Sequence, residues 1–370
     1  MEFAILFITI IFVSVFQIFI PFFAKRTVVF GVSIPNEQIK NPKVMKYKKI
    51  YTIITSIMAL IVLGGFFFWN QGQNVNETQL ALAGMMIPFI VLLVGLALYL
   101  YFHFTLSKLK KSQNWYRDVK QVYYADLATR SKDEMLAPFA HLMPIIISAG
   151  LVILTVNVYD RLPSQIPTHW GPTGQADAFS NKSWMTALGL PIILIIMQLM
   201  FFAINLFTKK SGIKINPGNV TSSKLRQLRL RKYTSWFLFV VNILLSLLFA
   251  ILQLNLIYEN VVNETFMMIL PLGFMVITLA GTIWLAVKVG SVDSDFEGKP
   301  IMESTNNVEA MDEDKYWKGG LFYYNRNDPS VFVEKRFGIG YTLNFANPIG
   351  YLIIILPIVL ICILPFFFNK

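Results

Sequence analysis

The chain contains eight long runs of apolar residues, and these runs limit its fold more than any other feature. They cover 3–23, 50–69, 80–104, 143–159, 185–207, 233–257, 266–287 and 347–368. A helix needs about 20 mainly apolar residues to cross roughly 30 Å of hydrocarbon, and each run approaches that length. Only 14% of the 370 residues are charged, whereas soluble domains have about 25%. The sequence therefore predicts an all-α integral membrane protein with a bundle of about eight transmembrane helices.

The basic residues lie almost entirely in four of the loops between these runs. Loops 24–49, 105–142, 208–232 and 288–346 contain 7, 7, 8 and 7 of the 32 Lys and Arg residues. Because basic loops stay on the cytoplasmic side of a membrane, we expect a multi-pass protein of the cell membrane with both termini and loop 160–184 outside. The net charge of +11 then reflects topology and contact with the anionic lipid bilayer. We expect no direct binding of nucleic acid.

The apolar runs contain no Asp, Glu, Lys or Arg. Ionisable groups inside a membrane mark ion pathways, proton relays and catalytic centres, so their absence argues against an ion-coupled transporter and an intramembrane protease. The amides in the runs, such as Gln198 and Asn242, are interpreted as partners in hydrogen bonds between helices. The one cysteine, Cys362, lies in the last run and is interpreted as a packing residue. We expect no enzyme activity, no cofactor and no metal site.

Loop 160–184 concentrates proline, glycine and histidine between two apolar runs. The stretch "IPTHW" at 166–170 predicts extended chain, because proline restricts its own backbone and that of the preceding residue. "GPTG" at 171–174 places Pro and Gly where a type I β-turn favours them. The chain then returns through Asp177 to the next run. We predict a small, stiff hairpin that caps the bundle on its extracytoplasmic side.

Several roles are open for His169. A metal ligand would need further His or Cys residues, because Asp160 and Asp177 alone make a weak site. As a general base with Asp177, His169 would need a nucleophile or an activated water, and no nucleophile motif surrounds it. A pH-sensitive recognition contact suits an imidazole, which titrates near neutral pH. We favour a structural role, in which His169 and Trp170 fix the hairpin to the helix ends by hydrogen bonds and aromatic packing.

The residues of this loop also carry a resemblance to a known family. Over roughly 143–207, the chain resembles a bacterial membrane domain of unknown function found in SdpI-type immunity proteins. Those proteins protect a cell from its own toxin peptide and take part in signalling by sequestering a repressor at the membrane. The resemblance implies immunity or sensing toward an envelope-active peptide or membrane stress. The residues that carry it, as recognition or structural residues, are Pro163, Pro167, His169, Trp170, Gly171, Pro172, Gly174 and Asp177.

A second resemblance covers 317–348, "WKGGLFYYNRNDPSVFVEKRFGIGYTLNFANP". This segment is similar to a short cytoplasmic module of unknown function that occurs in larger membrane proteins carrying the first domain. The resemblance implies a regulator protein as partner on the cytoplasmic side and no enzyme chemistry. Its candidate residues are Trp317, Gly319, Gly320, Tyr324, Asn325, Asp328, Pro329, Arg336 and Gly338.

Strand-like runs at 321–324, 331–335 and 341–345 predict a three-stranded antiparallel sheet within this module. A small sheet needs a covered face, so we expect it to join strands at 27–34 and 113–127 in one cytoplasmic domain. The acidic stretch 290–316 is interpreted as a flexible tether. Residues 211–232 predict a loop that leads into a basic helix continuous with the sixth run.

These observations divide the chain into five parts. They are an N-terminal region with three transmembrane helices (1–142), the SdpI-type domain (143–207), two further transmembrane helices (208–289), the tether with the β-rich module (290–346), and the last transmembrane helix (347–370). The leading hypothesis is a non-enzymatic membrane protein for immunity or sensing that signals to a cytoplasmic partner. The alternative is a permease-like or lipid-handling protein with a groove lined by Asn157, Gln198 and Asn242. An enzyme at the outer surface comes third.

Overall fold

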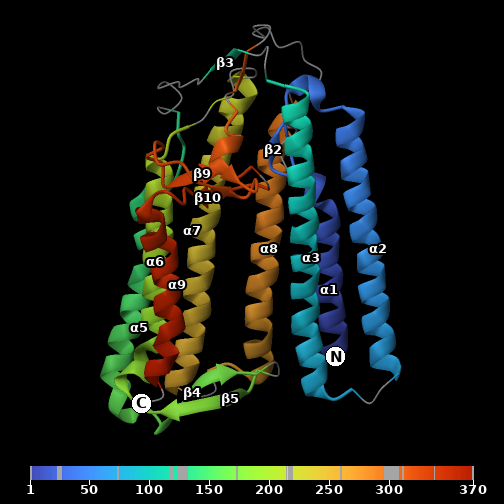
Figure 1. Cartoon of the computed structure of the whole chain (residues 1–370). Helices are drawn as coiled ribbons and strands as arrows, with labels where there is room; N and C mark the ends of the chain where they lie inside the picture. The colour runs from blue at the N-terminus through green and yellow to red at the C-terminus, as the bar shows by residue number, and fades with distance from the viewer. Residues whose placement is uncertain are drawn as a thin grey trace. The chain divides into compact units, whose positions relative to one another are not determined.

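The computed structural model confirms a helical membrane protein (Figure 1). It describes all residues except 1, 23–26, 73–74, 117–119, 123–131, 172–173, 214, 216–219, 259–260, 296–307, 311, 337 and 369–370. The helices of the described part are α1 (Glu2–Phe19), α2 (Pro42–Gly72), α3 (Glu77–Ser112), α5 (Ile145–Val158), α6 (Trp184–Lys210), α7 (Val220–Tyr258), α8 (Glu264–Asp295) and α9 (Pro348–Phe368). Seven of the apolar helical segments are long enough to cross a membrane, and α9 adds a shorter apolar stretch, Pro348–Leu364. The chain is a multi-pass membrane protein.

Several helices extend beyond the apolar runs into charged sequence. Helix α2 begins at Pro42, α3 ends at Ser112, and α8 continues to Asp295, into the stretch interpreted as a tether. Helix α7 begins at Val220, which confirms the predicted basic helix before the sixth run. Short 3-10 turns lie next to helices at Ile20–Phe22, Asn36–Gln38, Pro138–Leu142 and Tyr159–Arg161, and a further one, Asp314–Tyr316, precedes β7.

The described strands are short and occur in pairs. Four pairs are antiparallel: β1 (Val28–Val29) with β2 (Val32–Ser33), β4 (Gln165–Trp170) with β5 (Ala176–Asn181), β7 (Trp317–Lys318) with β8 (Phe322–Tyr323), and β9 (Phe332–Glu334) with β10 (Tyr341–Leu343). The fifth pair, β3 (Lys120–Val122) with β6 (Val308–Ala310), is parallel. The rest of the strand predicted at 113–127 lies partly outside the described residues.

The chain forms two compact units. Unit 1 contains Met1–Tyr123, Thr305–Tyr324 and Lys335–Gly338, and unit 2 contains Tyr124–Ser304, Asn325–Glu334 and Ile339–Lys370. The C-terminal module (residues 317–348) therefore supplies segments to both units.

The predicted three-stranded sheet of the C-terminal module is wrong. β8 pairs with β7 in unit 1, whereas β9 pairs with β10 in unit 2. The reason is the turn between β7 and β8, where Gly319 and Gly320 have φ of +59° and +73°. A two-residue hairpin turn of type I′ requires positive φ at both central residues. The two glycines meet this requirement, so β8 folds back on the strand directly before it.

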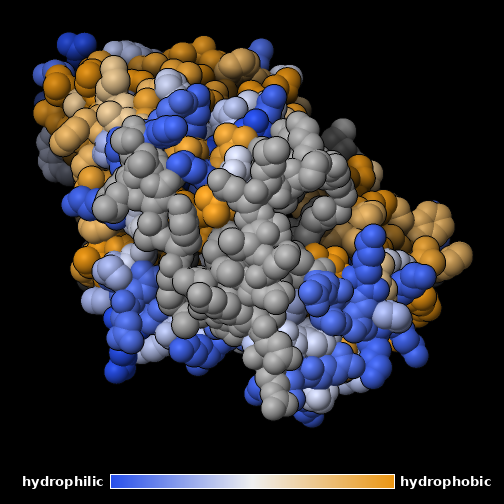
Figure 2. Space-filling view, turned by 90° about the horizontal axis from the view of Figure 1, so that it is seen from above, coloured by the Kyte–Doolittle hydropathy of each residue, from blue (hydrophilic) through white to orange (hydrophobic). Residues whose placement is uncertain are grey.

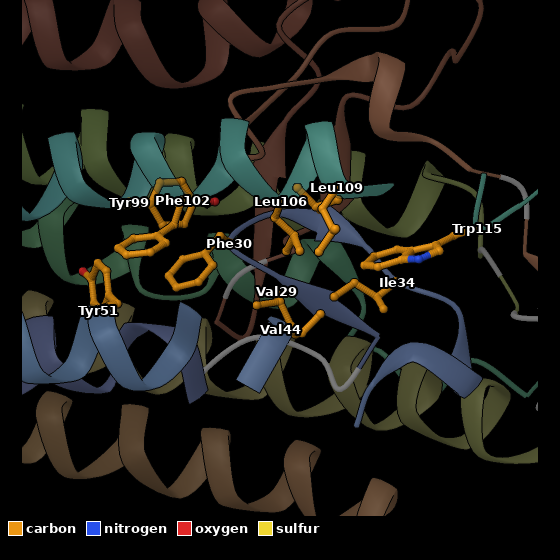
Figure 3. Close-up of a cluster of buried hydrophobic side chains, with 11 residues drawn as sticks. Val29, Phe30, Ile34, Val44, Tyr51, Tyr99, Phe102, Leu106, Leu109 and Trp115 are labelled. Carbon is orange, nitrogen blue, oxygen red and sulfur yellow. The ribbon is translucent and has the colours of Figure 1, made fainter. Parts of the chain in front are cut away.

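In unit 1, the segment between α1 and α2 forms part of the hydrophobic core (Figure 3). Phe30 lies in the turn of the β1–β2 hairpin, and its ring is 5.3 Å from the rings of Tyr51 and Phe102 and 6.1 Å from that of Tyr99. Phe30 is 2% exposed. Burial of an aromatic side chain of this size stabilises a fold by roughly 1.5–3 kcal/mol. The hairpin is thereby fixed between α2 and α3.

In unit 2, α6 packs against α5, α7 and α9, and α8 packs against α7. Gln198 of α6 is fully buried and links α6 to both α5 and α7. Its side chain bonds Ser148 Oγ of α5 (2.7 Å), Ser246 Oγ of α7 (2.9 Å) and the carbonyl of Pro144 (3.1 Å). Asn242 donates to the carbonyl of His141 (3.1 Å). The interpretation of these amides as partners between helices is confirmed. Strands β4 and β5 lie at one end of the unit 2 helices and β9 and β10 toward the other (Figure 1).

Candidate functional site

The β4–β5 hairpin is the predicted cap, and its turn has the expected hydrogen bonding. The amide of Gly174 donates to the carbonyl of Gly171 (2.9 Å), as in a β-turn, and the amide of Gly171 donates to the carbonyl of Gln175 (2.8 Å). Gly174 has φ of +84°, which only glycine adopts without strain. Pro172 and Thr173 lie outside the described residues, so the turn type stays a prediction.

One buried side chain attaches the hairpin to the helices. Ile166 of β4 is 0% exposed and packs with Leu162, Ala187 of α6 and Leu256 of α7. Its neighbours in the strand, Gln165 and the residues from Thr168 onward, remain exposed or partly exposed, as expected for a strand with one covered face. The hairpin is therefore anchored at its base and open along its length.

The return from the hairpin to α6 is also rigid. Lys182 donates to the carbonyls of Asp160 (3.3 Å) and Leu162 (3.1 Å). Ser183 and Thr186 then form a capping box at the start of α6, which satisfies backbone amides that have no partner inside the helix. The rings of Tyr159 and Trp184 stack at 3.7 Å. These contacts leave little freedom at the base of the hairpin.

The predicted attachment of His169 to a helix end is wrong. Its Nδ1 lies 2.5 Å from Oδ1 of Asp177 on the neighbouring strand, and the two side chains are 67% and 50% exposed. Asp177 also leaves little room for a side chain at position 171, because a Cβ at Gly171 would lie 2.9 Å from Oδ2 of Asp177. The pair holds the two strands together on the exposed face. Of the other loop residues, Pro163, Pro167 and Trp170 are partly buried.

The tip of the hairpin rests on the first turn of α8. A Cβ at Gly174 would lie 2.1 Å from the carbonyl oxygen of Glu264, and Gln175 Nε2 donates to Oε2 of Glu264 (3.0 Å). Asn263 caps this helix by accepting from the amide of Phe266 (2.8 Å). The sequence reasoning missed Glu264. The only local signal was the Asn-Glu pair typical of a helix start.

The other end of α8 contacts the C-terminal module within unit 2. Leu285 and Val289 of α8 are buried in a cluster with Leu230 of α7, and Ile339 and Tyr341 of the module pack against it. Burial raises the pKa of the Tyr341 hydroxyl above its ordinary value. Helix α8 thus joins the hairpin to strand β10.

A buried asparagine organises the module's turn in unit 2. Asn344 is 1% exposed, and its Nδ2 donates to the carbonyls of Asn325 and Asp328, both at 2.9 Å. Asp328 Oδ1 accepts from the amide of Ser330 (2.9 Å), and the carbonyl of Pro329 accepts from Asn347 (3.2 Å). The predicted Asn325, Asp328 and Pro329 are therefore turn residues. Asn344, which the sequence reasoning missed, satisfies their backbone.

The other candidate residues of the module lie in unit 1. Arg336 donates to the carbonyl of Gly31 (2.9 Å) and to Asp314, and its guanidinium lies 5.1 Å from the ring centre of Trp317. Burial raises the pKa of Asp314, but the positive charges of Arg336 and Lys110 lower it by more than burial raises it. The pKa therefore lies below its ordinary value. Of the predicted residues, Tyr324 is exposed, and Gly338 has φ of +72°.

The groove of the permease-like alternative does not form from its three amides. Gln198 and Asn242 are fully buried, whereas Asn157 lies on an exposed face of α5. In the described part of the chain, no three His, Cys, Asp or Glu residues gather in a group that could hold a metal ion.

Comparisons with known proteins match two segments of the chain. The model of a family described as "Domain of unknown function (DUF1648)" matches 145–195, which contains α5, the hairpin and the first part of α6. The model of a second, "Family of unknown function (DUF5808)", matches 326–351. A search of curated proteins and a search of solved structures each returned no match.

Proposed function

We propose that this chain is a non-enzymatic membrane protein that recognises an envelope-active peptide at the hairpin and signals to a regulator protein at the C-terminal module. The observation that carries this proposal is the position of α8. This helix touches the hairpin tip at Glu264, and at its other end it supplies Val289 to the buried cluster against which Tyr341 of the module packs. A change at one end therefore has a direct mechanical route to the other.

The form of the hairpin supports a peptide as the ligand. β4 and β5 pair only with each other among the described strands, so each has an edge without a strand partner. An extended peptide can add to such an edge through main-chain hydrogen bonds, while exposed side chains provide specificity. The exposed face presents His169, Asp177 and Phe179, whose ring is 54% exposed. The carboxylate of Asp177 and the exposed ring of Phe179 on the same strand suit a cationic, amphipathic peptide.

The packing of α8 supports its role in signalling. Only 6% of its apolar window is buried, the lowest value among the seven long spans of the described chain. A helix held along one side by α7 can tilt as a rigid body without disrupting a tightly packed core. A tilt caused at Glu264 would displace Val289 and Leu285 in the cluster against which Tyr341 packs.

The charge distribution supports the sides assigned to the two ends. The hairpin region carries only Arg161 and Lys182, whereas loops 24–49, 105–142, 208–232 and 288–346 carry most of the Lys and Arg residues. Positive loops face the cytoplasm. This charge bias supports an envelope-active peptide as the ligand of the hairpin and a cytoplasmic regulator as the partner of the module.

Survival of cells under peptide challenge tests the proposal. Cells lacking the chain should become more sensitive to at least one peptide in a panel of membrane-active peptides, and the wild-type chain should restore survival. Phe179→Ser and His169→Gln should reduce protection at unchanged protein level, because an exposed side-chain contact such as that between His169 and Asp177 adds only about 0–1 kcal/mol of stability. Tyr258→Ser, which changes an exposed aromatic residue outside the hairpin, is the matched control.

A second variant separates recognition from signalling. Gly174→Val should push the hairpin tip off Glu264, so peptide binding to the purified protein should persist while the transcriptional response of the cell is lost. Unchanged survival and unchanged transcription across the whole panel after deletion would overturn the proposal.

A further inference from the structure

A basic depression lies at the C-terminal end of α6, away from the hairpin. Its volume is about 380 Å³, and its lining residues are Asp133, Leu206, Lys209 and Lys210. Small-molecule sites typically have volumes of roughly 300–1,000 Å³. We propose that this depression binds the phosphate group of an anionic phospholipid.

The carboxylate in the lining does not oppose an anion, because a buried arginine neutralises it. Nε and Nη2 of Arg231 donate to Oδ2 of Asp133 at 2.9 and 2.7 Å, and the two side chains are 1% and 5% exposed. Oδ1 of Asp133 accepts from the amide of Met135 (3.2 Å). The remaining charge of the depression comes from the ammonium groups of Lys209 and Lys210.

Arg231 also satisfies the backbone at the end of α6. Its guanidinium donates to the carbonyls of Thr208 (3.0 Å), Lys209 (2.9 Å) and Ser211 (3.4 Å). The last carbonyls of a helix otherwise form its negative pole and attract nearby cations. In the described part of the chain, Lys209 forms no ion pair. Its ammonium group therefore remains free to bind an external anion.

An apolar stripe continues from the depression along α6. Leu206, Phe202 and Leu199 follow each other at spacings of four and three residues, so they share one face of the helix. Leu199 is 48% exposed, and the 73% exposed Phe139 lies beside this stripe, 5.9 Å from the ring of Phe202. A cationic pocket above a partly exposed apolar stripe matches a phospholipid, which has a phosphate head and acyl chains. A free phosphate ion would use only the pocket.

The position of the pocket fits the same ligand. Lys209 and Lys210 follow the apolar part of α6 directly, so their side chains lie at the height of lipid headgroups. In Figure 2, hydrophilic residues gather on the end face of the molecule and hydrophobic residues lie at its flanks. Basic pockets on the cytoplasmic side of membrane helices bind anionic headgroups.

Lipid titration of the purified full-length chain in detergent tests the proposal, with bound lipid counted by native mass spectrometry. Phosphatidylglycerol should bind more tightly than phosphatidylcholine with the same acyl chains. Lys209→Gln/Lys210→Gln should weaken phosphatidylglycerol binding about thirtyfold, because each lysine near the headgroups contributes about 1 kcal/mol and 1.4 kcal/mol corresponds to tenfold.

Two control variants and a competition experiment complete this test. Lys288→Gln removes an exposed lysine of α8 outside the depression and should leave binding unchanged. Lys209→Arg/Lys210→Arg keeps the charge and should retain most of the affinity, which excludes misfolding as the cause of the loss. Inorganic phosphate should not compete with the lipid at millimolar concentration. Full competition by phosphate, equal binding of the two lipids, or unchanged binding by the Gln variant would overturn the proposal.

Discussion

Gly31 and Gly320 meet backbone to backbone in unit 1, and alanine at Gly320 should force the two hairpin turns apart. A Cβ on Gly320 would lie 2.6 Å from the Cα of Gly31 and 2.9 Å from the hydroxyl oxygen of Tyr99. Both distances are shorter than real Cβ contacts, so the backbone has to move. Gly320 also has φ of +73°, a conformation that costs a residue with a side chain roughly 1–2 kcal/mol.

Alanine at Gly338 serves as the control that separates the cost of the positive φ from the cost of the steric clash. Gly338 belongs to the same unit and has φ of +72°, but nothing lies within 4 Å of an added Cβ. Gly338→Ala should therefore destabilise unit 1 by the backbone cost alone, about 1 kcal/mol. Gly320→Ala adds overpacking, which typically costs 1–3 kcal/mol, so the sum is about 3 kcal/mol.

Denaturant unfolding of the purified protein in detergent, followed by tryptophan fluorescence, measures these free energies. The double variant Gly31→Ala/Gly320→Ala should cost less than the sum of the single variants, because one separation of the turns relieves both contacts. Equal destabilisation by Gly320→Ala and Gly338→Ala would refute the close approach of the two turns.

Two further predictions concern unit 1 and the topology. The pKa of Asp314 lies below its ordinary value of about 3.9, so the stability that its charge contributes is complete above that value and is lost as the pH falls toward the lower pKa of the folded protein. Melting curves of the wild type should therefore shift down between about pH 5 and pH 3 more than those of Asp314→Asn, and equal shifts would contradict the role of its contacts with Arg336 and Lys110. In a background without the native cysteine, Ser164→Cys should react with an impermeant thiol reagent in intact cells, and Thr221→Cys only after lysis. The reverse labelling pattern would overturn the assignment of sides.

Much of the fold follows from local sequence properties. The length of an apolar run decides whether a helix can cross a membrane, so the helices could be predicted one by one. The hairpin was predictable for a similar reason, because proline restricts the backbone wherever it occurs, as at Pro167, and glycine permits the positive φ that a tight turn needs, as at Gly174. The candidate residues of the loop were thus located, but their partners were not. His169 suggested a link to the helices, whereas in the structure it lies opposite Ala178 at an irregularity of the β4–β5 ladder, and its ring contacts the carboxylate of Asp177.

The sequence by itself determined a multi-pass helical protein, a stiff hairpin between α5 and α6, and turns at the glycines of the module. These features depend on backbone preferences and hydrophobicity over a few neighbouring residues. Only the tertiary structure decided that Arg231 is buried against Asp133, that α8 joins Glu264 to Tyr341, and that the module's strands pair within separate units. These contacts join segments far apart in the chain. They form where two surfaces fit and satisfy each other's polar groups, and no local pattern contains that information.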